Sequence, residues 1–228
     1  AASLTGFSSL TWDGSAETDG SFNITGSTQA DTITGGSGDD VISGGDGADI
    51  LDGGNGDDIL KFASAESLSN DLKVDGGTDT DIISFTAEGV LVEDSDFAEV
   101  TNIETVVFSN GNNNASFGVN TSDAIASVIF GITSGIGNDI VDVNNLSKST
   151  YINTGAGSDQ IIGSQKSDTI IPMDGSDTIV ANSGDDTIVL GVYLGSSDHV
   201  DGGDGVDTLS FTDSGVATSD LDGVTNIE

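Results

Sequence analysis

Aspartate residues recur every nine residues along much of this chain, and carboxylates at that spacing can bind a cation. The stretch Gly26–Lys61 divides into four nonapeptides, GSTQADTIT, GGSGDDVIS, GGDGADILD and GGNGDDILK, and Thr154–Val189 divides into TGAGSDQII, GSQKSDTII, PMDGSDTIV and ANSGDDTIV. Every copy has Asp at its sixth position and Ile or Leu at its eighth. Oxygen donors of this kind suit calcium better than magnesium, which demands a stricter octahedron. Transition metals would favour His or Cys, and the chain has one His and no Cys.

The element that positions these aspartates is a tight turn followed by a very short strand. Glycines at positions one, two and four permit backbone conformations that side chains forbid. Two turn-and-strand halves close a flat coil, so residues two repeats apart stack at the spacing of neighbouring strands, roughly 4.8 Å. This register predicts four stacked pairs, Asp31 with Asp49, Asp40 with Asp58, Asp159 with Asp177, and Asp168 with Asp186. Stacked carboxylates repel one another unless a cation lies between them, which again favours calcium.

Three further copies stand alone, at GIGNDIVD from Gly135, GGTDTDIIS from Gly76 and GGDGVDTLS from Gly202. With Gly35–Lys61, which fits best, they carry a resemblance: the repeat resembles the RTX nonapeptide of the calcium-binding parallel β-roll. The resemblance implies an all-β fold, a parallel β-roll or β-solenoid with two RTX blocks and intervening strand-rich segments, and Ca²⁺ as the cofactor. The residues predicted to form the calcium sites, as ligands or as turn glycines, are Asp31, Gly35, Gly36, Gly38, Asp40, Gly44, Gly45, Asp46, Gly47, Asp49, Gly53, Gly54, Asn55, Gly56, Asp58, Gly76, Gly77, Asp81, Asp139, Gly155, Gly157, Asp159, Asp168, Asp174, Gly175, Asp177, Gly184, Asp186, Gly202, Gly203, Gly205 and Asp207.

The inner core is predicted to come from the aliphatic residues at position eight, because they alone alternate inward from each short strand. These residues are Ile33, Ile42, Leu51, Leu60, Ile161, Ile170, Ile179 and Ile188. The second acids at position five, Asp39, Asp57 and Asp185, are predicted to face solvent and to serve solubility.

Composition narrows the classes of partner. The formal net charge is -35, with 39 Asp and Glu against four Lys and Arg. Such a chain repels nucleic acid, whose binding rests on basic contacts, and it repels anionic membrane surfaces. The longest apolar run, Ala124–Ile132, has nine residues, too few to span a bilayer, and is predicted to be a buried strand. Calcium, neighbouring copies of the chain and cell-surface glycan remain as partners.

The lack of cysteine fits either a reducing compartment or a secreted bacterial protein without disulfides. Calcium binding favours the secreted protein. Extracellular calcium sites typically bind with dissociation constants of roughly 10⁻⁴ to 10⁻³ M, so they fill outside the cell and stay nearly empty in the cytosol. The protein is therefore expected to be unfolded before export and to fold outside the cell. The resemblance to RTX proteins also implies folding after export, because those proteins resemble substrates of one-step, type I bacterial secretion. We expect a secreted, extracellular location at the bacterial cell surface.

The repeats divide the chain into four predicted regions: 1–24, N-terminal strands that cap the roll; 25–108, a first RTX module with its roll at 25–61; 109–153, a connecting strand-rich segment; and 154–228, a second RTX module with its roll at 154–190. A duplication underlies the two modules, because VDGGTDTDIISF from Val74 matches VDGGDGVDTLSF from Val200, and VTNIE from Val100 matches VTNIE from Val224. The parent chain is therefore expected to be long and repetitive.

The second roll departs from the repeat. Gln165 and Lys166 occupy positions three and four of one turn, and Pro172 and Met173 replace both glycines of the next. We expect weaker or missing ions around Asp168 and firmer ones between Asp159 and Asp177. The twenty residues from Asp139 to Asp159 exceed one coil by two, which predicts a two-residue bulge.

Motifs for hydrolysis, phosphate binding and zinc binding are absent from the sequence. The pair Asp198 and His199 is conceivable as a catalytic dyad, but an exposed turn residue is the preferred interpretation of His199. We therefore expect no enzymatic activity. Three functions stay open: a structural segment of a surface protein, such as an S-layer protein or RTX adhesin; a secretion and folding module of an exoenzyme such as a protease, lipase or epimerase; and a module that binds a glycan or partner through 86–132.

Overall fold

The structure is a computed structural model, and it describes residues 2–3, 8–118, 129–212 and 217–228. Nearly every regular element in it is a short strand paired in parallel with a strand one coil away, so the predicted all-β parallel β-solenoid is confirmed. The chain forms two compact units. The described residues of Ala1–Ala87 and Glu93–Val107 make the first unit, and those of Glu88–Val92, Phe108–Ser122 and Val128–Glu228 make the second.

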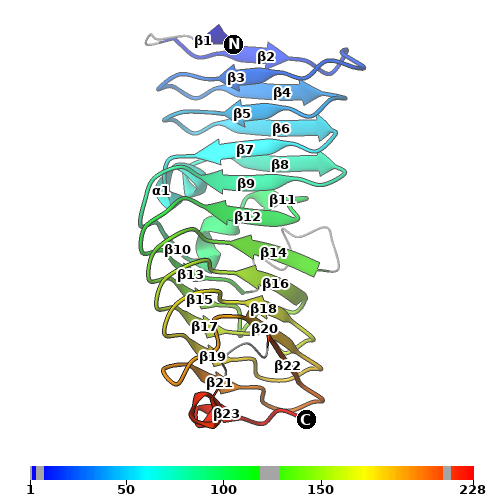
Figure 1. Ribbon diagram of the computed structural model, residues 1–228. Helices are drawn as coiled ribbons and strands as arrows, with labels where there is room; N and C mark the ends of the chain where they lie inside the picture. The colour runs from blue at the N-terminus through cyan, green and yellow to red at the C-terminus, as the bar shows by residue number, and fades with distance from the viewer. Residues whose placement is uncertain (1, 4–7, 119–128, 213–216) are drawn as a thin grey trace. The chain divides into compact units, whose positions relative to one another are not determined.

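The first unit has two stacks of strands, visible in Figure 1 as alternating rungs. One stack is β1 (Ala2–Ser3), β3 (Asn23–Thr25), β5 (Val41–Ser43), β7 (Ile59–Phe62), β9 (Ile82–Phe85) and β12 (Thr105–Phe108). The other is β2 (Thr11–Asp13), β4 (Thr32–Gly36), β6 (Ile50–Asn55), β8 (Lys73–Thr78) and β11 (Val100–Thr101). A one-and-a-half-turn helix, α1 (Ala65–Ser69), and a 3₁₀ turn, η1 (Asp94–Phe97), pack against each other beside the strands.

The second unit repeats this arrangement. One stack is β14 (Ile129–Thr133), β16 (Ser149–Asn153), β18 (Thr169–Ile171), β20 (Thr187–Gly191) and β22 (Thr208–Phe211). The other is β10 (Leu91–Val92), β13 (Asn114–Ser116), β15 (Ile140–Asp142), β17 (Gln160–Ile162), β19 (Thr178–Val180), β21 (His199–Asp201) and β23 (Val224–Thr225), with a second 3₁₀ turn, η2 (Thr218–Leu221), before β23.

The predicted coil length is confirmed wherever the repeat is unbroken. Ile24 pairs with Ile42, and Ile33 with Leu51, in the first roll. Ile152 pairs with Ile170 in the second. Each partner lies two nonapeptides further along the chain, as the sequence indicates.

Insertions between strands lengthen some coils without disturbing the strand register. The two extra residues predicted as a bulge before Asp159 are an example. Pairing between β15 and β17 is continuous, so the predicted two-residue bulge lies outside these strands. The extra residues lie in the connection between β15 and β16, where Val143 and Leu146 are buried. A surface connection absorbs added length more easily than a hydrogen-bonded strand does.

The core confirms the position-eight prediction. Ile33, Ile42, Leu51 and Leu60 are each fully buried in the first unit, and their counterparts in the second unit are 0 to 1% exposed. One large aliphatic per half-coil is therefore enough to fill the narrow interior. Larger side chains fill the wider coils outside the perfect repeats, where Phe62, Phe85 and Phe97 are buried.

The predicted duplication is also visible as matched structure. Val100 pairs with Val74 in the first unit, and Val224 pairs with Val200 in the second. In the first unit the Asn102 side-chain amide donates to Asp75 Oδ1 at 2.7 Å. Its counterpart in the second unit, Asn226, donates to Asp201 Oδ1 at 2.6 Å. The two modules thus share side-chain contacts as well as amino-acid sequence.

The predicted apolar strand at 124–132 falls partly outside the described residues, since only Ile129–Thr133 is described there, as β14. Within the described part of the chain, no helix is long and apolar enough to cross a membrane.

Candidate functional site

The aspartates at position six stack into ladders, with each carboxylate bound to the main chain of the neighbouring coil. Asp31 N donates to Asp49 Oδ1 at 2.8 Å, and Asp40 N donates to Asp58 Oδ1 at 2.7 Å. In the second unit Asp159 N donates to Asp177 Oδ1 at 3.0 Å, and Asp168 N donates to Asp186 Oδ1 at 2.7 Å. All four predicted pairs are therefore confirmed. The carboxylates do not face one another directly, because an N–H group lies between each pair.

The ladders include residues that the sequence did not predict as ladder members. Asp49 N donates to Asp71 Oδ1 at 3.0 Å, and Asp177 N donates to Asp198 Oδ1 at 2.9 Å. Asp198 carries a weak signal, since Val200 follows it at the repeat's spacing. Asp71 follows α1 and carries none. Asn113 and Thr150 take the aspartate's place in two other coils, where Asn113 N donates to Asp139 Oδ1 at 2.8 Å and Thr150 N donates to Asp168 Oδ1 at 2.7 Å.

A glutamate continues one ladder of each module. Asp81 N donates to Glu104 Oε2 at 2.7 Å, and Asp207 N donates to Glu228 Oε2 at 3.0 Å. The glutamates are the last residues of the two VTNIE segments. The duplicated sequence thus preserves the ladder contact.

The second oxygen of most ladder aspartates has no hydrogen-bond partner although it is buried. Among the described residues this holds for Oδ2 of Asp49, Asp58, Asp71, Asp81, Asp139, Asp159, Asp177, Asp186 and Asp207. These residues are 0 to 4% exposed. A buried, unpartnered carboxylate oxygen is costly, so each of these positions favours a bound cation.

Burial also changes the acidity of these groups. Loss of hydration raises the pKa of Asp58, Asp81 and Asp186 to about 7, and neighbouring carboxylates add to the rise. The same cause raises the pKa of Asp71 and Asp177 to about 7. It raises the pKa of Asp159 to about 6. The negative charge is therefore destabilised until a cation offsets it.

Ten of the described turns fall into two classes, set by the backbone at position two. The turn of Asp139 belongs to neither, because its Oδ2 lacks a partner although Gly135 at position two is not left-handed. We call a turn open when its position-two residue has a left-handed backbone and its aspartate Oδ2 lacks a partner. The open turns have Gly45, Gly54, Gly77, Gly155, Met173, Asn182 and Gly203 at position two, with φ between 66° and 112°. Glycine takes this conformation without strain, but methionine does not.

We call a turn closed when the N–H of position two donates to the aspartate Oδ2. Ser27 donates to Asp31 at 2.5 Å, Gly36 to Asp40 at 2.7 Å, and Ser164 to Asp168 at 2.7 Å. In closed turns the main chain satisfies the oxygen that stays unpartnered in open turns.

Glycine at position one leaves room for the carboxylate in the open turns of the first unit, although the open turn of Asp186 accommodates Ala181 at this position. A Cβ at Gly44 would overlap Asp49 Oδ2, and one at Gly53 would overlap both Asp58 Oδ2 and the Gly76 carbonyl oxygen. The predicted glycines thus make room for oxygen atoms. At position three, by contrast, the side chains of Asp46, Asn55 and Asp174 are exposed on the outside of the turn.

Hard cations fit this donor set. No group of three or more His, Cys, Asp or Glu side chains converges within the described ranges. A cation in an open turn would therefore combine the free Oδ2 with main-chain carbonyl oxygens, which is calcium's ordinary ligand chemistry. The exposed position-five acids Asp39, Asp57 and Asp185 lie outside the ladders, as predicted.

Comparison with known families identifies the repeats. The chain matches the RTX calcium-binding nonapeptide repeat (4 copies) over residues 25–60, 153–188 and 194–211. The repeats belong to the RTX calcium-binding family. This RTX β-roll is thus a calcium-binding segment, and RTX repeats are typical of secreted bacterial proteins. No curated protein matches the chain. Asp71 and Asp139 lie outside the matched ranges, although both have the unpartnered oxygen of an RTX ladder.

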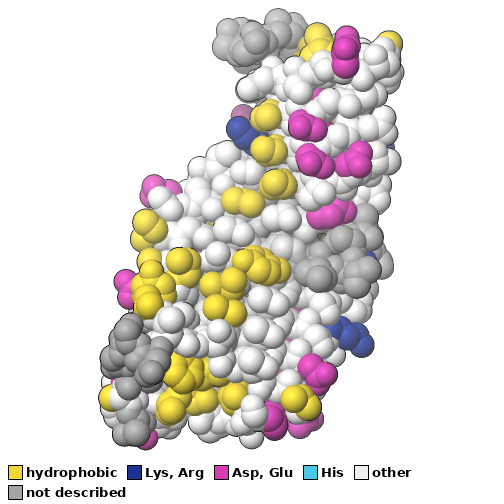
Figure 2. Space-filling view, turned by 45° about the vertical axis from the view of Figure 1, so that its right-hand side comes forward, with side chains coloured by type: hydrophobic (Ala, Val, Ile, Leu, Met, Phe, Trp, Pro, Cys, Tyr) yellow, Lys and Arg dark blue, Asp and Glu magenta, His cyan; other side chains and the backbone are white. Residues whose placement is uncertain are grey.

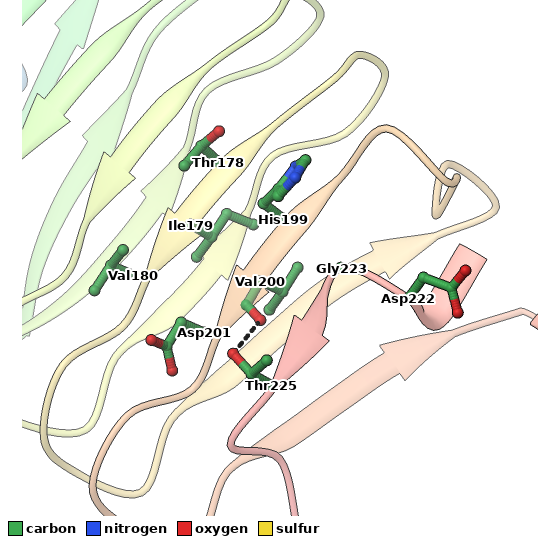
Figure 3. A pocket seen from close by; sticks show the side chains of 9 residues that line it. All are labelled: Thr178, Ile179, Val180, His199, Val200, Asp201, Asp222, Gly223 and Thr225. Atoms are coloured by element: carbon green, nitrogen blue, oxygen red, sulfur yellow. Dashed lines mark hydrogen bonds between the residues drawn. The ribbon is translucent and has the colours of Figure 1, made fainter. Parts of the chain in front are cut away.

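Asp198 and His199 have different hydrogen-bond partners in this RTX segment. Asp198 is buried, and its two oxygens accept from Asp177 N and Gly195 N. His199 is exposed, with Nδ1 3.2 Å from the Ser197 carbonyl oxygen. Figure 3 shows His199 at the rim of a shallow hollow over β19, β21 and β23. The exposed position of His199 agrees with the preferred interpretation of it as a surface turn residue.

Proposed function

We propose that the chain is a calcium-dependent structural segment of a large secreted bacterial surface protein, such as an S-layer protein or RTX adhesin, and that it has no catalytic role. One observation carries the proposal: the same module occurs twice, with matched strand pairs and matched ladder ends. Repetition of a whole module lengthens a solenoid, because each coil contacts only its neighbours. A structural surface protein needs such length, whereas an enzyme's export module does not.

Calcium supplies the folding energy in this proposal. If free calcium is about ten times the dissociation constant, each occupied site adds about 1.4 kcal/mol of stability. Occupation of all open turns then contributes on the order of 10 kcal/mol, which equals the stability of a whole domain. At the low calcium of a cytoplasm this contribution vanishes, and the charge of -35 favours the unfolded chain. The segment therefore folds after export.

Neighbouring copies are the proposed partners. Figure 2 shows groups of hydrophobic side chains next to acidic ones on the surface. Ile136 is 66% exposed and Val206 is 64% exposed, so apolar side chains are available for contacts between chains. Calcium would also neutralise much of the repulsion that keeps two such acidic chains apart.

Light scattering during a calcium titration tests the proposal. We expect the particle size to rise in the same calcium range in which β structure forms. A chain that folds with calcium but stays monomeric at millimolar calcium would overturn the surface-protein proposal. That result would favour the second candidate, a secretion and folding module of an exoenzyme, which the calcium ladders alone also support.

A further inference from the structure

The two serine-closed turns satisfy their aspartates completely. In the turn of Asp168, Ser164 donates its N–H to Oδ2 at 2.7 Å and its hydroxyl to Oδ1 at 2.9 Å. In the turn of Asp31, Ser27 donates its N–H to Oδ2 at 2.5 Å and its hydroxyl to Oδ1 at 3.1 Å. Two donors from one serine therefore occupy the carboxylate that a cation would need.

The serine hydroxyl also fixes the rest of its turn. Ser164 Oγ accepts from Lys166 N at 3.0 Å, and Ser27 Oγ accepts from Gln29 N at 3.1 Å. The sequences of these turns, GSTQAD and GSQKSD, share only the first glycine, the serine and the aspartate. The same hydrogen bonds arise in both, so the serine is the common cause.

Open turns keep their shape even without glycine at position two. Asn182 has φ 75° and Met173 has φ 66°, and the aspartates of their turns, Asp186 and Asp177, have an unpartnered Oδ2. The Asn182 side chain donates instead to the Gly163 carbonyl oxygen at 2.7 Å. A left-handed backbone at methionine costs free energy, so another interaction in the native protein must offset that cost. A cation bound to the free oxygen would do so.

We propose that serine at position two locks a turn closed and free of calcium, whereas a left-handed residue there prepares the turn for an ion. The proposal rests on calcium binding by the RTX repeats and specifies which turns take part. Asp31 and Asp168 are then ion-free members of the ladders. Asp40 differs, because Gly36 lacks a hydroxyl and glycine can adopt either conformation.

One consequence concerns low calcium. Each roll contains one serine-closed turn, at Asp31 in the first and at Asp168 in the second. In these turns serine donates to both oxygens of the aspartate, so the carboxylate needs no ion. Each roll therefore has a turn that stays ordered in chelator and onto which the neighbouring open turns can fold.

Substitution of Ser164 tests the lock. The full chain is dialysed against saturating calcium, and bound calcium per chain is measured by elemental analysis. Ser164→Gly is expected to bind one more ion than the wild type, because glycine without the serine hydroxyl can adopt the left-handed backbone of an open turn. Ser164→Ala is the matched control and is expected to keep the wild-type ion count, since alanine still donates its N–H and avoids the left-handed conformation.

The opposite substitution, which places serine in an open turn, tests the proposal even if Ser164→Gly fails to fold. Asn182→Ser is expected to close the turn of Asp186 and to bind one ion fewer, while Asn182→Gly keeps the wild-type count. Hydrogen exchange in chelator supplies a second readout: amides around Asp186 become more protected in Asn182→Ser only. Unchanged ion counts in both Ser164→Gly and Asn182→Ser would overturn the proposal. A wild type that binds no calcium would instead refute its premise.

Discussion

Replacement of Asp58 by asparagine should have opposite effects in chelator and in calcium. Asp58 is fully buried, its Oδ1 accepts from Asp40 N at 2.7 Å, and its Oδ2 has no partner. Asp58→Asn keeps the oxygen acceptor and removes the charge. Without calcium it is expected to stabilise the first roll, and with calcium it is expected to remove one carboxylate ligand.

The size of the effect in chelator follows from the raised pKa of Asp58. Burial raises the pKa of Asp58 from 3.8 to about 7. For a fully shielded carboxylate this corresponds to about 4 kcal/mol at pH 8, and solvent screening at the turn reduces it to about 2 kcal/mol. At free calcium of about one hundred times the dissociation constant, the wild-type site adds about 2.7 kcal/mol, which the variant loses. The expected change is therefore a gain of about 2 kcal/mol in chelator and a small loss in calcium.

Amide hydrogen exchange in β7 (Ile59–Phe62) measures these local free energies, with sucrose present in both conditions to keep the chain folded. Asp57→Asn is the matched control, because Asp57 is exposed and its Oδ1 accepts from Thr80 N at 2.9 Å, a bond that asparagine retains. We expect the control to change protection by less than about 0.5 kcal/mol in either condition. An Asp58→Asn variant that loses the same protection in chelator and in calcium would refute the role of the unpartnered oxygen.

Three further predictions concern the turns, the core and acidity. Gly53→Ala is expected to weaken calcium binding at least about tenfold, because in this turn its Cβ would overlap the Gly76 carbonyl oxygen as well as Asp58 Oδ2. Gly195→Ala, with no atom closer than 3.9 Å, should leave the affinity unchanged, and equal calorimetric affinities for the two variants would contradict this. Leu60→Ala, at a fully buried position, is expected to cost about 2–5 kcal/mol in urea denaturation with calcium, and a cost under about 1 kcal/mol would count against the narrow core. Burial raises the pKa of Asp81 and Asp186 from 3.8 to about 7, so their contribution to calcium-free stability is full below pH 3.8 and is lost as the pH rises through 7. The calcium-free roll should therefore be more stable at about pH 5 than at about pH 8 in urea denaturation with chelator, and the opposite order would show that these carboxylates are not destabilised by burial.

Much of the roll could be predicted because one short repeat determines both the turn and the strand. The spacing of Asp31, Asp40, Asp49 and Asp58 fixes the register, and the buried residue two places after each aspartate fixes which face lies inside. The matching VTNIE segments predicted a duplication that the structure shows as equivalent strand pairs. These features depend on local pattern alone, which a single sequence contains.

The class of each turn could not be predicted in the same way. GGSGDD at Gly35 and GGNGDD at Gly53 fit the repeat equally well, yet the first is closed and the second is open. Glycine adopts both backbone conformations at little cost, so stacking against the neighbouring coil decides between them. Asp71 was missed for a related reason: its place in the ladder depends on the connection through α1, which brings it beside Asp49 without a repeat of its own.

Circular dichroism of the whole chain across a calcium titration, from chelator to millimolar calcium, measures whether calcium drives folding. We expect a change from a largely unordered chain to a β-rich one, at neutral pH, with magnesium unable to replace calcium at the same concentration. A chain that is already fully β-structured in chelator and unchanged by calcium would contradict the claim that calcium in the open turns drives folding.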